Sequence, residues 1–176
     1  MENVVTIASR SNFNVALTTT GNVVNWGSKE YDPFSNQQIE LSDLKNISAV
    51  CLSVNHVGNH IAMLTFDGHV VCRGNTSQFG QCKVSVDLEN VVSICCGYFH
   101  TSALTADGRV VCWGNNANEQ CNVPPDLENV VSICCGYYHT TAVTSDGKVV
   151  CWGSNFNEQC NVPDGLVANT GMVVLM

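Results

Sequence analysis

Cysteine and histidine are the side chains of this 176-residue chain most able to do chemistry, since thiols and imidazoles bind soft metals and react as nucleophiles or bases. The chain has eleven cysteines and five histidines. Cys95-Cys96 is followed by His100, and Cys134-Cys135 by His139, at the same spacing. The C-C-x-x-x-H spacing matches no zinc knuckle or ribbon, and neighbouring strand residues point to opposite faces. We therefore predict no metal site and no cofactor, with most thiols free and packed as small apolar groups.

Catalysis is not expected from the histidines either. His60, His100 and His139 each lie eight residues before a glycine, so the same histidine recurs along the chain. A repeated residue cannot be the single base of an active site, and no serine or cysteine with an aspartate partner stands beside it at a diagnostic spacing. We predict that the protein is not an enzyme and has no catalytic residues.

These residues recur because the chain is built from internal repeats. The segment Glu89–Pro124 recurs as Glu128–Pro163, with 29 of 36 positions identical. A recurring G-x-V-V pattern then defines four units with glycines at 21, 68, 108 and 147. The predicted units are residues 2–44, 45–88, 89–127 and 128–163. Residues 164–176 remain as a closing or partial-repeat strand.

Each unit is predicted to form a small antiparallel sheet. Val91–Cys96, His100–Thr105 and Arg109–Trp113 are β-branched or alternating segments, separated by glycine turns such as Asp107-Gly108. Gln120–Pro124 is a candidate fourth, edge strand. All-β repeats of about 40 residues must stack to bury their faces, which predicts an all-β fold of propeller blades with three to four strands each.

The third unit, VVSICCGYFHTSALTADGRVVCWGNNANEQCNVP, resembles the regulator of chromosome condensation repeat. The shared features are the glycine and histidine after the first strand, Ala-Leu in the second, then Asp-Gly, Trp-Gly-x-Asn and a glutamine. The short repeat is also similar to the propeller-type β-lactamase inhibitor protein. The resemblance implies a structural hydrogen-bonding role for the repeated histidine. It also implies a ring of about seven blades, so two chains could complete a larger ring as a homodimer.

One face of the predicted blades gathers aromatic loops. The loop between the first two strands and the loop after Trp-Gly must lie at the same end of each sheet. Such aromatic loops favour binding of a partner protein, although packing between blades is the alternative, especially for the tryptophans. The largest difference between the twin units, Ala117 against Phe156, falls in these loops. The candidate partner-binding residues are Tyr98, Phe99, Trp113, Ala117, Glu119, Tyr137, Tyr138, Trp152 and Phe156.

Two other functions stay open at this stage. The family resemblance implies regulation of an enzyme, by guanine nucleotide exchange on a small GTPase or by inhibition of a hydrolase. The cysteines allow a redox or metal-binding scaffold, since Cys51, Cys95 and Cys134 occupy equivalent inner-strand positions and could form a thiol ladder.

Charge and hydropathy limit the classes of partner that the chain is expected to bind. Seven basic and fifteen acidic residues give a net charge of -8, which opposes binding to nucleic acid and to anionic membranes. No apolar stretch approaches the roughly 20 residues that span a bilayer. We therefore expect an intracellular, cytoplasmic protein. Acidic residues also gather on the face opposite the aromatic loops, where they form either a basic-partner site or a solvated rim.

Overall fold

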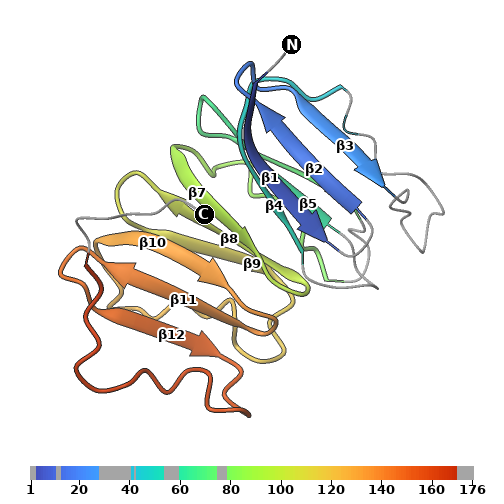
Figure 1. The fold of residues 1–176 in the computed structure, drawn as a ribbon. Helices are drawn as coiled ribbons and strands as arrows, with labels where there is room; N and C mark the ends of the chain where they lie inside the picture. Colours follow the sequence, from blue (N-terminus) through green and yellow to red (C-terminus); the bar gives the residue numbers. More distant parts are fainter. Residues whose placement is uncertain are drawn as a thin grey trace.

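The computed structural model describes residues 3–10, 13–27, 41, 43–53, 60–74 and 79–169. In these residues the chain forms four three-stranded antiparallel sheets, each with its strands in sequence order. The sheets follow one another in chain order, with the first and the last at opposite ends (Figure 1). We call them blades one to four. Their strands are β1 (Val4–Arg10), β2 (Phe13–Thr18), β3 (Val23–Gly27), β4 (Ile47–Leu52), β5 (His60–Thr65), β6 (Val70–Gly74), β7 (Val91–Cys96), β8 (His100–Thr105), β9 (Val110–Gly114), β10 (Val130–Cys135), β11 (His139–Thr144) and β12 (Val149–Gly153).

The turns between the second and third strands also connect one blade to the next. Gly108 has φ +81°, a conformation that favours glycine. Its carbonyl accepts the backbone N–H of Val130 at 3.1 Å, and the Gly68 carbonyl accepts that of Val91 at 3.0 Å. The turn of each blade therefore positions the first strand of the following blade.

Among the described residues each blade has three strands, the lower end of the expected range of three to four. Gln120–Pro124, the candidate edge strand, is turn and irregular structure. After blade four, Lys148 and Val167 form an isolated antiparallel bridge, and Ala168 N–H donates to the Gly147 carbonyl at 2.9 Å. This hydrogen bond is equivalent to those by which Gly68 and Gly108 position the first strand of the next blade. The rest of the expected closing strand, from residue 170, lies outside the described residues.

The hydrophobic core lies between blades and not within them. Leu64 of blade two packs with Val91 and Ala103 of blade three in one cluster. In the next cluster Leu104 of blade three packs with Ile133 and Trp152 of blade four. Burial of each valine, leucine or isoleucine side chain in these clusters contributes about 1.5–3 kcal/mol. Blade stacking is therefore the main source of stability, as repeat architecture requires.

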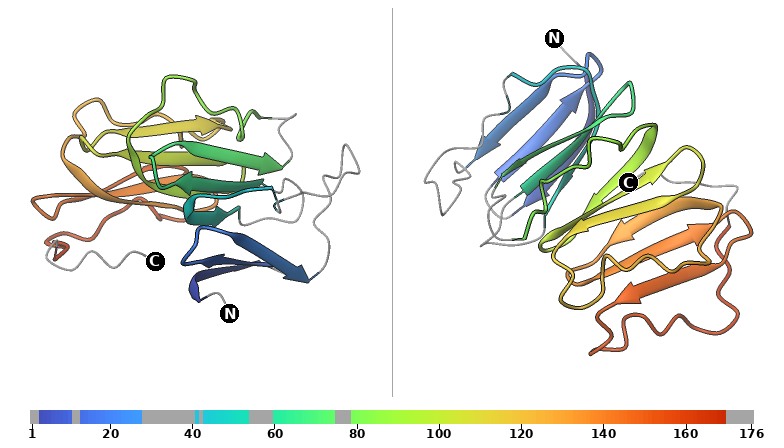
Figure 2. Two further views of the ribbon diagram at one scale, coloured as in Figure 1. Left: turned by 90° about the horizontal axis from the view of Figure 1, so that it is seen from above. Right: turned by 180° about the vertical axis from the view of Figure 1, so that it is seen from behind.

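The two end blades leave opposite faces uncovered, blade one the face toward a preceding blade and blade four the face toward a following blade (Figure 2). Val4 of blade one is 54% exposed, whereas its counterparts Val91 and Val130 are each 4% exposed. At the other end, His139 and Val143 of blade four are half-buried although the matching positions of blade three are buried. Blades one and four therefore each present a stacking surface that the described residues do not cover.

Candidate partner-binding face

The predicted loop face forms where two sets of loops meet. The turn between β7 and β8 holds Tyr98 and Phe99, and the loop after β9 begins at Asn115. Asn115 N–H donates to the Phe99 carbonyl at 2.7 Å, and Ser154 N–H donates to the Tyr138 carbonyl at 2.8 Å in blade four. The expected placement of both loop sets at one end of the sheet is therefore correct for blades three and four.

Five aromatic rings form a continuous strip across blades two, three and four. Tyr98 and Tyr137 stack with their centroids 4.5 Å apart, and Tyr98 N–H donates to the Tyr137 carbonyl at 3.0 Å. Phe99 contacts Tyr98 at 4.2 Å and Phe79 at 4.7 Å, while Tyr138 lies 5.6 Å from Tyr137. These five residues, Phe79, Tyr98, Phe99, Tyr137 and Tyr138, are called the aromatic strip.

The aromatic strip is partly open to solvent. Tyr137 is 45% exposed and Phe79 is 36% exposed. Partial burial, followed by the neighbouring Tyr98 and Tyr137 phenols, raises the pKa of Tyr138. The strip therefore offers flat apolar faces together with hydroxyl groups that can donate hydrogen bonds.

At the blade-four end, the aromatic strip borders a hollow, and the exposed ring of Phe156 lies beside it. Tyr137, Tyr138, Ser154 and Phe156 line this hollow together with neighbouring residues. Phe156 is 89% exposed, and Ala117 is exposed at the same place in blade three. The difference between the twin units therefore changes the surface and not the core.

Asparagine side chains hold the loop beneath Ala117 in one conformation. Asn115 Oδ1 accepts hydrogen bonds from Ala117 N–H at 2.9 Å and from Gln120 Nε2 at 3.1 Å. Glu119 is exposed and adopts φ +63°, where blade two has Gly80 at φ +73°. Glu119 therefore takes the left-handed position that Gly80 takes in blade two, and it adds a charged side chain to the surface.

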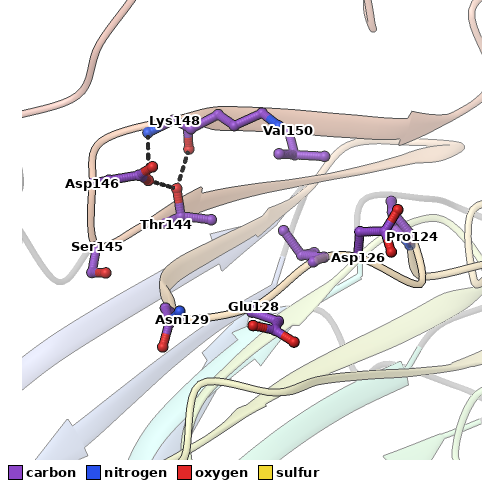
Figure 3. A pocket seen from close by; sticks show the side chains of 10 residues that line it. Pro124, Asp126, Glu128, Asn129, Thr144, Ser145, Asp146, Lys148 and Val150 are labelled. Atoms are coloured by element: carbon purple, nitrogen blue, oxygen red, sulfur yellow. Dashed lines mark hydrogen bonds between the residues drawn. The ribbon is translucent and has the colours of Figure 1, made fainter.

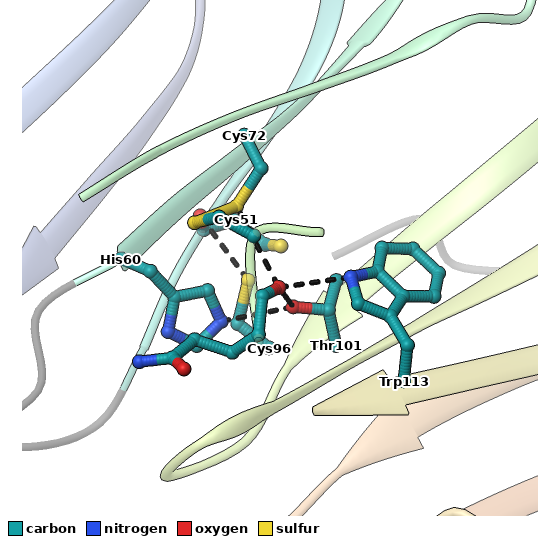
Figure 4. Close-up of a disulfide and its surroundings, with 8 residues drawn as sticks. Cys51, His60, Cys72, Cys96, Thr101 and Trp113 are labelled. Carbon is teal, nitrogen blue, oxygen red and sulfur yellow. Dashed lines mark hydrogen bonds between the residues drawn. A yellow bond between two sulfur atoms is a disulfide. The ribbon is translucent and has the colours of Figure 1, made fainter. Parts of the chain in front are cut away.

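The two candidate tryptophans bond to the preceding blade. Trp113 Nε1–H donates to the Gln81 carbonyl at 2.8 Å (Figure 4), and Trp152 Nε1–H donates to the Gln120 carbonyl at 3.0 Å. Trp152 is only 8% exposed. The packing role, which was the alternative for these residues, therefore accounts for their positions, and Trp152 has little surface to offer a partner.

The repeated histidine also connects blades. His60 Nε2 shares a hydrogen bond with Thr101 Oγ1 at 3.0 Å, and His100 Nε2 does so with Thr140 Oγ1 at 3.1 Å. Both imidazoles are fully buried. This is the structural hydrogen-bonding role that the resemblance implied. His139 has the same position in blade four, where the described chain supplies no following blade.

Nine of the eleven cysteines are free, and Cys72 is joined to Cys82 by a disulfide. The sequence did not signal this pair because a spacing of ten residues between a strand and a loop is not diagnostic. The described residues contain no group of three or more His, Cys, Asp or Glu side chains arranged to hold a metal ion. Cys95 lies next to Cys135, with the sulfur atoms 2.7 Å apart, so the thiols do not follow the alternative ladder of Cys51, Cys95 and Cys134.

The opposite face has a groove at each of the last two blade junctions. Asp126, Glu128, Asp146 and Lys148 line the one before blade four (Figure 3). Asp87, Glu89 and Arg109 line the preceding groove with their neighbours. Basic side chains therefore interrupt the acidic face that the composition predicts.

Comparison with known proteins identifies the repeats. Residues 91–120 and 130–159 match the family model of the regulator of chromosome condensation (RCC1) repeat. Units three and four are RCC1 repeats. No curated protein sequence matched the chain. Within the described residues, no helix is long and apolar enough to cross a membrane.

Solved structures with the same architecture include known RCC1 propellers. Prp20p from Saccharomyces cerevisiae is 25% identical, with a TM-score of 0.70 over 92% of this chain and 46% of that one. The ectodomain of the Physcomitrella patens receptor kinase CR4 is 20% identical, with a TM-score of 0.73 over 97% and 47%. Human WBSCR16 is 18% identical, with a TM-score of 0.61 over 86% and 48%. The chain therefore has the blade architecture of RCC1 propellers and spans about half the length of these structures.

Proposed function

We propose that this chain is a non-enzymatic interaction module that binds a partner protein through the aromatic strip and the adjoining Phe156. The observation that carries the proposal is the stacked Tyr98–Tyr137 pair beside a phenylalanine that is 89% exposed. Tyrosines that are held by stacking lose little conformational entropy on binding, and aromatic residues supply most interface hot spots.

Protein binding by a related propeller supports the proposal. Prp20p was studied for its binding to Gsp1p and histones, and yeast RCC1 (Prp20) has been solved bound to Kap60. Enzyme regulation, by nucleotide exchange on a small GTPase or by covering a hydrolase active site, is a narrower form of the same function. It rests on the resemblance alone, so the broader proposal is the one to test first.

Quantitative pull-down with the full chain tests the strip. Phe156→Ala gives blade four the alanine that blade three has at Ala117, so the loop should keep its conformation. We expect Phe156→Ala or Tyr137→Ala to reduce recovery of bound protein by about fivefold or more, since hot-spot truncation costs above 1 kcal/mol. Phe66→Ala is the matched control, because Phe66 is 64% exposed beside the Asp67-Gly68 turn at the opposite end of its sheet. Equal recovery by all three variants would contradict the proposal.

We also propose that a second copy of the chain is one partner and stacks its blade one on blade four of the first copy. Inside the chain, every junction from blade two onward uses the same pair: a threonine that bonds the preceding histidine and a tryptophan that bonds the preceding carbonyl. In blade one, Asn14 and Trp26 are cross-strand partners in the register of Thr101 and Trp113. Trp26 is 48% exposed, in contrast to its bonded counterparts.

The uncovered side of blade four carries the complementary groups. His139 corresponds to His100, and Gln159 corresponds to Gln120, whose carbonyl accepts the Trp152 N–H. Stacking two copies head to tail would therefore continue an interface that the chain already makes. Two such contacts give eight blades, which is within the range known for propellers.

Sedimentation velocity over a concentration series tests the second copy. Ile7 is 58% exposed, whereas its counterpart Ile133 is 9% exposed under the preceding blade. We expect the wild type to dimerise and Ile7→Asp to be monomeric with unchanged circular dichroism. Val5→Asp is the matched control, because the counterpart Val92 is 52% exposed even inside the stack. A wild-type chain that stays monomeric at all concentrations would contradict this proposal.

A further inference from the structure

Two equivalent thiol pairs lie between neighbouring blades. Cys95 of β7 and Cys135 of β10 have their sulfur atoms 2.7 Å apart. One junction earlier, the Cys96 thiol lies within hydrogen-bonding reach of the Cys51 thiol and donates to the Cys51 carbonyl at 3.5 Å. Cys51 corresponds to Cys95, and Cys96 corresponds to Cys135. The same thiol pair therefore occurs at two consecutive blade junctions, each time between the first strands of neighbouring blades.

A buried histidine accompanies each pair. His60 contacts Cys96 (Figure 4), and His100 contacts Cys135. Each ring uses Nε2 for its threonine, while Nδ1 is buried without a hydrogen-bond partner among the described residues. Each imidazole therefore lies beside one thiol of its pair, where it favours the thiolate form.

The two thiols of a pair differ in acidity. Burial opposes ionisation of Cys135, but hydrogen bonds from Cys95 and His100 outweigh it and lower the pKa of the Cys135 thiol. Burial, then Cys135, raises the pKa of Cys95. Cys96 and Cys51 differ in the same sense. Each pair thus combines a nucleophilic sulfur with a protonated neighbour in contact with it, which is the arrangement of an attacking and a resolving thiol.

We propose that Cys95–Cys135 and Cys51–Cys96 are peroxide-reactive sites that become disulfides joining neighbouring blades. The Cys135 thiolate attacks one oxygen of hydrogen peroxide, so that an S–O bond forms, the O–O bond breaks and hydroxide leaves with a proton as water. Cys95 then attacks the sulfenic acid, the S–S bond forms and the S–O bond breaks, releasing a second water. The two thiols are oxidised by two electrons and the peroxide is reduced. Cys96 and Cys51 react in the same roles.

These bonds would differ from the disulfide already present. Cys72–Cys82 joins a strand to the following loop within blade two, and Cys151 and Cys160, with sulfurs 2.8 Å apart, are the matching pair in blade four. The proposed bonds instead connect one blade to the next. At the remaining junction Ala8, Leu52 and Phe13 take the corresponding places, so no such site exists between blades one and two.

Peptide mapping after peroxide treatment tests the proposal. The full chain is reduced, exposed to hydrogen peroxide, blocked with N-ethylmaleimide, digested without reductant and analysed by tandem mass spectrometry. We expect Cys51–Cys96 and Cys95–Cys135 cross-links. Because Cys95 and Cys96 are adjacent, Cys96→Ala should retain only the Cys95–Cys135 link and Cys95→Ala only the Cys51–Cys96 link. Cys134 is exposed and has no described partner thiol, so it should be alkylated in every sample.

The rate of oxidation separates a specific site from a loosened fold. His100→Gln should slow peroxide oxidation of Cys135 about tenfold at pH 7 and move its half-maximal rate to higher pH, while oxidation of Cys96 beside His60 stays unchanged. General unfolding would accelerate all thiols instead. A Cys95–Cys96 vicinal disulfide, or maleimide on all four cysteines after peroxide treatment, would overturn the proposal.

Discussion

At the scale of single residues, the buried ring of His100 leaves no room for a side chain at Gly97. A Cβ at Gly97 would overlap the His100 ring and lie 2.7 Å from the Gly136 carbonyl oxygen. At Gly136 the three nearest atoms all belong to the His139 ring, which is half-buried because no described blade follows it. We predict that Gly97→Ala destabilises the fold by about 2–3 kcal/mol, and that Gly136→Ala costs below about 1 kcal/mol since His139 can turn away.

Urea denaturation of the two variants measures this difference. Both replacements stiffen the unfolded chain equally, so that contribution cancels in the comparison. Equal losses at the two positions would mean that His100 is no more tightly held than His139, contrary to its hydrogen bond with Thr140.

At the scale of the elements, the Asp-Gly turns make stability depend on acid pH. A hydrogen bond from the Thr105 hydroxyl, followed by one from Arg109, lowers the pKa of Asp107, and the Thr65 and Thr144 hydroxyls do the same for Asp67 and Asp146. A carboxyl whose pKa is lower when folded stabilises the fold above its ordinary value of 3.8, and the contribution disappears as pH falls through the folded pKa.

The unfolding midpoint should therefore drop as the pH is lowered below about 4. Thr105→Val removes the donor to Asp107, so it should flatten this dependence and move the Asp107 titration, followed by NMR, to higher pH. The outcome that contradicts the argument is an Asp107 titration at the same pH in Thr105→Val and in the wild type.

The sequence predicts the elements better than their contacts. Val91–Cys96 and His100–Thr105 match β7 and β8, and the third strand begins one residue later than expected, because β-branched runs between glycine turns are local signals. The thiol pairing was missed for a tertiary reason. The first strands of neighbouring blades are offset by one residue relative to each other. Cys95 therefore faces Cys135 and not its own counterpart, Cys134. Likewise, no local signal distinguishes a tryptophan that bonds a preceding blade from one on a binding loop.

At the scale of the whole molecule, the proposed self-association depends on the two uncovered end faces. Blade one has Asn14 where the internal junctions have Thr101 and Thr140, which bond the histidine of the preceding blade. Under the proposed head-to-tail contact, Asn14 of one copy faces His139 of the other. The larger amide fits this place less well than a threonine hydroxyl, which occupies it twice within the chain.

Asn14→Thr should therefore tighten self-association. One well-formed hydrogen bond contributes about 0.5–1.5 kcal/mol, so the dimer Kd should fall by roughly twofold to tenfold in sedimentation equilibrium. The effect must depend on the acceptor: combined with His139→Ala, the Asn14→Thr change should no longer alter Kd, because the hydroxyl then has no imidazole to bond. A gain that persists in the double variant would place the contact elsewhere on blade one and contradict continuation of the internal blade stack.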